Sequence, residues 1–290
     1  MEYDAIIIGK GPAGISASLY LARAGYRVLV VGKDGGALER AEKIENYYGF
    51  PDPLTGAELV NRGIGQATRL GVTVVSDEVT GISLEDSLQV KTPRGEYRAK
   101  TVLLATGKSR ISLKVPGFEE YRGRGISFCA ICDGFFYRGK RLGIIGTGDY
   151  AAAEFNELLH FTKDLTLFTN GEPISSTNFP ANMAVVTERI LSFTGEGKLE
   201  AIVTDGIEGG SVYSVDGFFV AIGTAGAADF AAKIGIEVKG TDIVVDGEHM
   251  TNVPGVFAAG DCIGGYLQVA KAVADGALAA KGMVAFLKKK

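Results

Sequence analysis

The sequence has few of the residues that build metal sites and disulfide scaffolds, and it has no long hydrophobic run. Its 290 residues include two histidines and three cysteines. This excludes a multi-histidine metal centre and a secreted disulfide framework. We expect His160 and His249 at surface or capping positions, and we expect Cys262 to be a small core or turn residue rather than a third redox thiol. No apolar stretch reaches about 18 residues, which excludes a transmembrane helix, and a hydrophobic share of 46% excludes disorder.

The chain also lacks an excess of positive charge. It has 30 Lys and Arg against 34 Asp and Glu, a net charge of -4, and its pI is about 5.4. Such a chain is a poor nucleic-acid binder. The first residues, MEYDAIIIG, contain neither a basic leader segment nor a small-residue cleavage site. We therefore expect a cytoplasmic protein that has neither nucleic acid nor a membrane as a partner.

Glycine, in contrast, is abundant. It accounts for 41 residues, about twice its usual share, which favours tight turns and close approach of the backbone to a ligand. Short apolar runs alternate with helical patterns, and this alternation predicts an α/β fold with buried parallel strands. The sequence pattern between about residue 72 and residue 100 predicts an antiparallel insert. The expected strands are 5–8, 28–31, 102–105, 142–145, 165–168, 218–222 and 256–259, and the expected helices are 14–24, 57–70, 151–161 and 268–287.

One internal repeat indicates the domain organisation. A strand, a glycine turn and a helix start occur at 5–14 and again at 142–151, which predicts two Rossmann-like domains, each with three-layer ββα architecture. A third strand, within 252–261, ends in Gly-Asp before the C-terminal helix. We predict a discontinuous first domain, 1–113 plus 241–290, with the second domain, 114–240, inserted into it.

The first glycine turn has the pattern of a dinucleotide site. Gly9, Gly11 and Gly14 form G-x-G-x-x-G directly after a short apolar strand and before a helix, the setting that this fingerprint requires. The first glycine makes the tight turn, the second lets the backbone approach a pyrophosphate, and the third lets helix and strand pack closely. We therefore predict that this turn binds a dinucleotide.

The acidic residue that usually ends the second strand of such a site is absent, because Gly32-Lys33-Asp34 follows Val31. We expect the backbone of 32–38 to contact the ribose, with Asp34 as a candidate ligand. Gly260-Asp261 predicts a carboxylate near the ribityl or pyrophosphate region, with an ordinary helix N-cap as the alternative for Asp261.

Two cysteines, Cys129 and Cys132, give the most specific chemical signal in the chain. Thiols two residues apart at a helix start can form a small-ring disulfide. Zinc would need two further ligands, for which the sequence offers only distant candidates, so we expect no metal. Asp133 could exchange a proton with a departing thiolate or cap the helix.

Together these motifs resemble the low-molecular-weight thioredoxin reductases. The resemblance is carried along the chain by GKGPAG at 9–14, IENYYGFP at 44–51, ATG at 105–107, CAICDG at 129–134 and TNVPGVFAAGD at 251–261. It implies the class II flavin disulfide reductase architecture, a homodimer, and thioredoxin as a partner. It also implies a redox-active disulfide between Cys129 and Cys132, with Asp133 as the acid and Cys132 facing the flavin. The FAD-binding residues it implies are Gly9, Gly11, Pro12, Ala13, Gly14, Gly32, Lys33, Asp34, Gly36, Ala37, Leu38, Asn46, Thr106, Gly107, Gly260, Asp261, Gln268, Val269 and Ala270.

The second glycine turn departs from the family. NADPH-using members grip the 2′-phosphate with an arginine cluster after the second strand of the inserted domain, but here no Lys or Arg occurs from 165 to 187, and Glu172 lies in this stretch. Tyr150 puts a phenol where the family has a small serine beside the pyrophosphate. No carboxylate stands at the strand end to hold the ribose of NADH. We therefore predict a degenerate pyridine-nucleotide site.

A branch of the family that takes electrons from reduced ferredoxin lacks the same arginine cluster, and this chain resembles it. Residues 108–141 contain eight basic and three acidic residues, a patch to which an acidic ferredoxin could be steered. NADPH-using relatives could share such a patch. We predict a ferredoxin-linked thioredoxin-disulfide reductase. The alternatives are an NADPH- or NADH-dependent thioredoxin reductase with an altered nucleotide site, and a flavin redox sensor without turnover.

Overall fold

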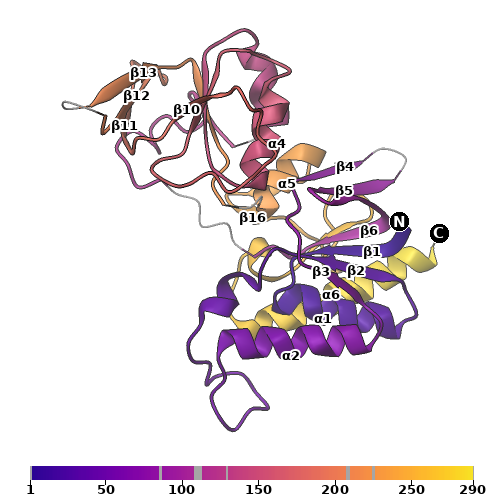
Figure 1. Ribbon diagram of the computed structural model, residues 1–290. Helices are drawn as coiled ribbons and strands as arrows, with labels where there is room; N and C mark the ends of the chain where they lie inside the picture. The colour runs from indigo at the N-terminus through magenta and orange to yellow at the C-terminus, as the bar shows by residue number, and fades with distance from the viewer. Residues whose placement is uncertain are drawn as a thin grey trace. The chain divides into compact units, whose positions relative to one another are not determined.

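The protein was analysed as a computed structural model, which describes residues 2–84, 87–107, 113–128, 130–206, 210–223 and 226–289 (Figure 1). The chain divides into two compact units. Unit 1 consists of Met1–Ser109 and Gly226–Lys290, and unit 2 consists of Arg110–Ala225. Unit 1 is built around a mixed β-sheet and unit 2 around a parallel one.

The sheet of unit 1 has parallel strands at its centre. The order of these strands is β3 (Thr73–Val75), β2 (Val28–Val31), β1 (Glu2–Ile8) and β6 (Gly95–Leu104). A fifth parallel strand, β17 (Val256–Ala258), also pairs with β6. The first half of β6 pairs antiparallel with β5 (Leu88–Thr92), which pairs in turn with β4 (Gly81–Leu84). The segment predicted as an antiparallel insert therefore begins with a strand, β3, that belongs to the parallel sheet.

Three helices pack on one face of this sheet, α1 (Pro12–Arg23), α2 (Gly56–Arg69) and α6 (Val269–Lys288) (Figure 1). Helices α1 and α6 lie side by side. All four residues of β2 are buried, as expected for an apolar strand in the centre of a parallel sheet. The helices in the described ranges lack the combination of length and apolar character that a bilayer-spanning segment needs.

The sheet of unit 2 is parallel throughout. Its strands follow the order β10 (Ala184–Val186), β9 (Leu165–Phe168), β8 (Leu142–Ile145), β14 (Gly217–Val220) and β7 (Ile126–Ser127). Helix α4 (Asp149–Leu158) follows β8, and an antiparallel meander is formed by β11 (Ile190–Thr194), β12 (Ala201–Thr204) and β13 (Ser211–Ser214). Phenylalanines, among them Phe168, Phe193 and Phe218, fill the core between the sheet and the meander.

The short elements lie next to the predicted functional segments. The 3₁₀ helix η1 (Gly36–Arg40) follows β2, and η3 (Gly260–Ile263) follows β17. In unit 2, α3 (Ala130–Asp133) and the 3₁₀ helix η2 (Gly134–Tyr137) follow β7.

The predicted boundary at residue 240 is wrong. Residues 226–240 belong to unit 1, because α5 (Ala227–Ile234) packs on β4 and on β16 (Asp242–Ile243), and β15 (Val238–Lys239) pairs with β16. The Nζ atom of Lys233 also donates to the carbonyl oxygen of Thr80 at 3.2 Å. The contacts of α5 with β4 and of Lys233 with Thr80 join residues far apart in the sequence, and short-range patterns do not contain them.

Candidate functional site

The first glycine turn joins β1 to α1 and leaves an opening at its centre. Gly9 has φ of +114°, and a methyl group placed on it would collide with the carbonyl oxygen of Ala105. A methyl group on Gly14 would collide with the carbonyl oxygen of Gly9. At Gly11, by contrast, the nearest neighbouring atom lies 4.0 Å from the position of an added methyl group. The turn is therefore packed tightly against the sheet but open at Gly11, where a ligand can approach the backbone.

Helix α1 begins at this opening. Its N-cap, Gly11, makes no side-chain capping hydrogen bond, and Pro12 occupies the first turn. The free N–H groups of a helix start bind phosphate, since they point at the ligand and the helix dipole favours negative charge there. The start of α1 thus fits a pyrophosphate.

At the end of β2, the charged side chains contact the protein itself. The Nζ atom of Lys33 lies 2.8 Å from Glu78 Oε2, and the Oδ1 atom of Asp34 accepts from the backbone N–H of Gly36 at 2.9 Å. Because Asp34 caps its own turn, the polar groups that remain here for a ribose are mostly those of the backbone.

The opposite side of the opening is formed by the C-terminal part of the chain. The Nδ2 atom of Asn46 donates to Gln268 Oε1 at 3.1 Å, although 222 residues separate them. A methyl group on Gly260 would lie 2.9 Å from the Cβ atom of Ala13. The fold thus brings together predicted site residues from both ends of the sequence.

Thr106, at the end of β6, supplies an unsatisfied polar atom. Its Oγ1 atom is buried and has no hydrogen-bond partner among the described residues. A buried hydroxyl without a partner is costly in a folded protein unless a ligand or water satisfies it. Together with the open Gly11 and the uncapped α1, Thr106 makes this edge of the sheet fit a dinucleotide cofactor.

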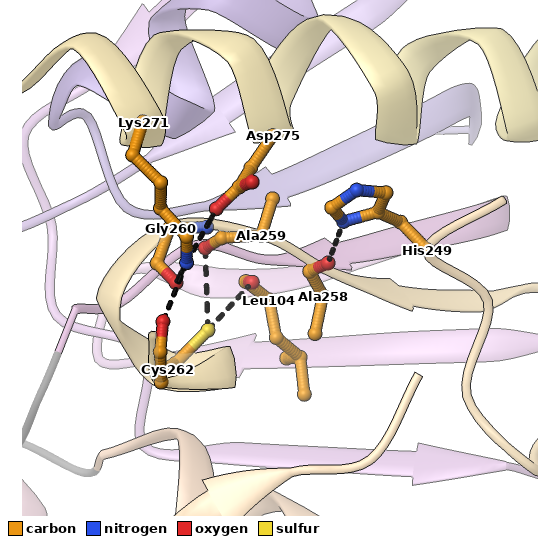
Figure 2. Close-up of polar contacts among 9 residues, drawn as sticks. Leu104, His249, Ala258, Ala259, Gly260, Cys262, Lys271 and Asp275 are labelled. Carbon is orange, nitrogen blue, oxygen red and sulfur yellow. Dashed lines mark hydrogen bonds and ion pairs between the residues drawn. The ribbon is translucent and has the colours of Figure 1, made fainter. Parts of the chain in front are cut away.

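Two residues that the sequence analysis missed hold the turn after β17 (Figure 2). From α6, the Nζ atom of Lys271 donates to the carbonyl oxygens of Gly260 (3.1 Å) and Gly264 (2.6 Å) and lies 2.7 Å from Asp275 Oδ2. Asp275 Oδ2 also accepts from the N–H of Gly260 at 3.1 Å. The sequence contained one signal for this pair, which was the i,i+4 spacing of a lysine and an aspartate near the start of a predicted helix.

Cys262 and His249 lie near this network but are buried (Figure 2). The Cys262 thiol donates to the carbonyl oxygens of Leu104 (3.3 Å) and Ala259 (3.2 Å), and burial raises its pKa to about 12. The prediction of a core cysteine is confirmed. The predicted surface position of His249 is wrong, because its side chain is buried. The Nδ1 atom of His249 lies 3.1 Å from the carbonyl oxygen of Ala258.

In unit 2, the cysteine segment follows β7. Cys129 and the side chain of Cys132 lie outside the described residues, and the backbone of Cys132 belongs to α3. Asp133 is held from β7, where Ser127 Oγ donates to its Oδ2 atom at 2.6 Å. Burial, and then the negative charge of Asp133, raise the pKa of Tyr137 in η2. Asp133 is therefore an oriented carboxylate next to the cysteine segment.

The second glycine turn repeats the backbone geometry of the first. Gly146 has φ of +146°, and a methyl group on it would collide with the carbonyl oxygen of Ala221, the counterpart of Ala105. Tyr150, however, is fully buried, and its hydroxyl lies 3.5 Å from the carbonyl oxygen of Phe128. The predicted placement of this phenol beside a pyrophosphate is therefore wrong.

A loop covers this second turn. The carbonyl oxygen of Thr147 accepts from the backbone N–H groups of Ser175 (2.9 Å) and Ser176 (3.1 Å). At the start of α4, the Oδ1 atom of Asp149 accepts from Ser176 Oγ (2.6 Å) and Asn178 Nδ2 (3.0 Å). The loop at 175–178 thus packs against the second glycine turn, while the start of α4 at Gly148, like that of α1, has no side-chain cap.

One cation from outside the window of 165–187 lies beside the turn that follows β9. A methyl group on Gly171 would lie 3.5 Å from the Cγ and Nε atoms of Arg189. Arg189 directly precedes β11 and comes to the turn through the fold, so local spacing gave no signal for it.

Comparison with known proteins identifies the family. The model of the pyridine nucleotide-disulphide oxidoreductases matches residues 3–276. The thioredoxin reductase of Aquifex aeolicus is 35% identical over 298 residues, which cover 98% of this chain and 92% of that protein. The chain belongs to the thioredoxin reductases. The enzyme of Treponema pallidum is 33% identical over 300 residues, with coverage of 99% and 97%.

Solved thioredoxin reductase structures resemble the whole chain. The atypical thioredoxin reductase of Desulfovibrio vulgaris Hildenborough has a TM-score of 0.92 and 39% identity, and the match covers 99% of this chain and 98% of that one. A ferredoxin-flavin thioredoxin reductase of Clostridium acetobutylicum has a TM-score of 0.75 and 28% identity, with coverage of 100% and 99%. This thioredoxin reductase has the two-domain flavin disulfide reductase fold.

The cofactor of this family is FAD, and the chain is a flavin disulfide oxidoreductase. The site in unit 1 fits FAD. The uncapped start of α1 and the opening at Gly11 would receive the pyrophosphate, and the orphan hydroxyl of Thr106 supplies a further polar contact.

Proposed function

We propose that this thioredoxin reductase takes its electrons from reduced ferredoxin and passes them through FAD and the Cys129–Cys132 pair to the disulfide of thioredoxin. Two ferredoxins deliver one electron each. The electron pair, with two protons, breaks the Cys129–Cys132 disulfide and is then transferred to thioredoxin by thiol–disulfide exchange. The second glycine turn, with a loop packed against it and no Lys or Arg at 165–187, is the observation that carries the choice of donor.

That turn is unsuited to a pyridine nucleotide for two reasons. The loop at 175–178 hydrogen-bonds to Thr147 and Asp149, which fixes it beside the turn that a pyrophosphate would approach. Asp149 also places a carboxylate in the first turn of α4, where it would repel the phosphates. Charge-assisted hydrogen bonds to a phosphate contribute roughly 1.5–3 kcal/mol each, and the arginine cluster that makes them in relatives is missing.

The cofactor and the residues of the cysteine segment have separate roles in the proposed reaction. When bound, FAD accepts electrons and supplies a pair to a disulfide. We propose that Asp133, oriented by Ser127, gives a proton to a departing thiolate and takes it back. Cys132 is proposed to face the flavin and Cys129 to be its partner in the disulfide.

An exposed aromatic pair next to the cysteine segment supports docking of thioredoxin. Phe135 and Phe136 are 64% and 69% exposed, and the guanidinium of Arg138 lies 5.5 Å from the ring centre of Phe135. Exposed neighbouring aromatic rings beside an arginine are typical of protein interfaces. We assign this surface to the thioredoxin substrate.

Part of the predicted basic patch supports ferredoxin docking. Lys108 and Arg110 lie outside the described residues, and Arg141 is engaged by Asp216 at 3.1 Å. The guanidinium of Arg122 lies 4.8 Å from the ring centre of Phe128, beside Cys129 in the sequence. The Arg122 side chain is half exposed, and its ion pair with Glu119, at 3.7 Å, is solvent-exposed. We include the exposed cations of this patch other than Arg138 in the proposed ferredoxin surface. On the resemblance to the family, we also propose a cytoplasmic homodimer.

Arg189 favours a second candidate, an NADPH-dependent enzyme. Its position beside Gly171 would give a 2′-phosphate one cation from outside the usual cluster. One exposed arginine replaces only part of an arginine cluster, and the loop over Thr147 would still have to open.

Anaerobic titration of the oxidised holoenzyme distinguishes the two candidates. NADPH, NADH and chemically reduced ferredoxin are added separately, and the visible flavin absorbance is followed. We expect bleaching with ferredoxin only. Rapid bleaching with NADPH that is lost in R189A would establish the second candidate in place of the first.

A further inference from the structure

Lys10 is a buried lysine in the first glycine turn, directly before Gly11, and it is 8% exposed. Within the described ranges its ammonium has one hydrogen-bond partner, the neutral Oγ atom of Ser76 at 2.7 Å. The neighbouring Lys33, in contrast, lies 2.8 Å from the carboxylate of Glu78. Burial of a charge is costly unless an opposite charge or further hydrogen bonds compensate for it. The ammonium of Lys10 therefore needs acceptors beyond the one that the described part of the chain supplies.

The side chain of Lys10 crosses the carboxyl end of β2. Strands β1, β2 and β3 are neighbours in the sheet of unit 1 (Figure 1), and Lys10, Gly32 and Ser76 follow closely after them. A methyl group on Gly32 would lie 3.0 Å from the Cγ atom of Lys10. The aliphatic stem thus lies against Gly32, and the ammonium extends from the turn at Gly11 across β2 to the end of β3.

The end of β2 is the place where a Rossmann site holds the ribose, usually with an acidic side chain. Here Gly32 follows β2, and Asp34 caps its own turn. Lys10 is the side chain that fills the space left by Gly32. An ammonium has three donors, of which Ser76 uses one, and the hydroxyl oxygens of a ribose can accept the others.

We propose that Lys10 binds the ribose in the adenosine half of FAD, with its ammonium donating to the 2′-hydroxyl oxygen in place of the acidic residue that the end of β2 lacks. The inference does not depend on the electron donor of the enzyme. A lysine with this role strengthens FAD binding and destabilises the protein without FAD, because its charge is then buried with a single neutral partner. A lysine that serves the fold alone would stabilise the protein with or without the cofactor.

Three variants test the charge. K10M removes the ammonium and keeps an apolar side chain of similar length on Gly32. K10A is a second uncharged variant if K10M does not fold. K91M removes an exposed lysine of β5, paired with Glu96 at 3.6 Å, and serves as the matched control.

The test is FAD binding to the full-length protein from which FAD has been removed, followed by flavin fluorescence. ADP and 2′-deoxy-ADP, which resemble the adenosine half of FAD, serve as competitors. We expect K10M to raise the dissociation constants of FAD and ADP about tenfold, as for one hydrogen bond from a charged donor, and to leave that of 2′-deoxy-ADP unchanged. The protein without FAD should be at least as stable to chemical denaturation in K10M as in the wild type. K91M should match the wild type throughout.

Three results would overturn the proposal. The first is an unchanged FAD dissociation constant in both K10M and K10A. The second is an equal loss of affinity for ADP and 2′-deoxy-ADP, which would place the ammonium at the pyrophosphate instead of the ribose. The third is a less stable K10M protein with wild-type affinity for FAD, which would give Lys10 a structural role.

Discussion

Lys271 lies 2.7 Å from Asp275 on the first two turns of α6, and together they hold both ends of the turn that follows β17. A cation in the first turn of a helix opposes the helix dipole. Lys271 is stabilised there because it binds two carbonyl oxygens and a carboxylate at once. The pair therefore shapes the cofactor site without itself being one of its predicted ligands.

Removal of Lys271 should weaken both the fold and FAD binding. In K271A the mostly buried carboxylate of Asp275 loses its counter-charge, and we expect a loss of about 2 kcal/mol in unfolding free energy, less than for a fully buried pair because Lys271 is partly exposed. The FAD dissociation constant should rise about tenfold, which is about 1.4 kcal/mol. Chemical denaturation and flavin fluorescence measure the two effects. K281A, an exposed lysine on the same helix, should change neither.

Replacement of Cys132 by serine should abolish reduction of thioredoxin and leave FAD bound. The flavin spectrum of C132S reports cofactor binding, and turnover with thioredoxin reports the redox role. Retained turnover in C132S would remove this residue from the proposed mechanism.

We expect Asp133 to act by transferring a proton, and we expect Ser127 to act by orienting the carboxylate of Asp133. We expect D133N to slow reduction of thioredoxin about 100-fold, within the usual range for general acid–base catalysis. S127A should slow it about tenfold, since the carboxylate is kept but no longer oriented. Single-turnover kinetics of the prereduced enzyme measure this step. A rate for S127A below that of D133N would show that Ser127 has a role apart from Asp133.

The buried Cys262 thiol predicts a specific pH dependence of stability. Its pKa is raised from 9.0 to about 12 by burial. Between these values the unfolded chain releases the thiol proton and the folded chain keeps it, so the stability that this thiol contributes is lost as the pH rises from 9 toward 12. We expect C262A to show a shallower decline of the unfolding free energy over this range. Parallel slopes for the two proteins would contradict the assignment.

The exposed rings of Phe135 and Phe136 should matter to thioredoxin and not to small disulfides. For F135A/F136A we expect KM for thioredoxin to rise about tenfold, because buried aromatic anchors often contribute more than 1 kcal/mol each to an interface. Turnover with a small aromatic disulfide should be unchanged. I174A, an exposed apolar residue elsewhere in unit 2, serves as the control. Equal losses on both substrates would point to damage at the cysteine pair instead.

Local patterns predicted the elements of this fold well where a strand or helix is defined by its own sequence. The strands predicted at 28–31 and 165–168 have the bounds of β2 and β9, and the helix predicted at 268–287 differs from α6 by one residue at each end. The glycine fingerprint likewise located the open turn at Gly11, because its function depends on neighbours within six residues.

Long-range contacts limited the prediction of the site. Nothing near residue 171 indicates that Arg189 lies against it, and nothing near Tyr150 indicates that its hydroxyl lies beside the carbonyl oxygen of Phe128, just after β7. The membership of α5 in unit 1 similarly depends on β4, well over 100 residues earlier in the chain. Such features arise from packing, and periodicity does not report packing between distant segments.

The hydrogen bond between Asn46 and Gln268 has a consequence for the order of assembly during synthesis. One side of the cofactor site emerges from the ribosome early and the other only after the whole of residues 110–225 has been made. The intervening unit has a continuous sequence and its own core, so it can fold while its host is still incomplete. FAD capture is therefore a late event, and nascent chains that stop before α6 should be released without cofactor.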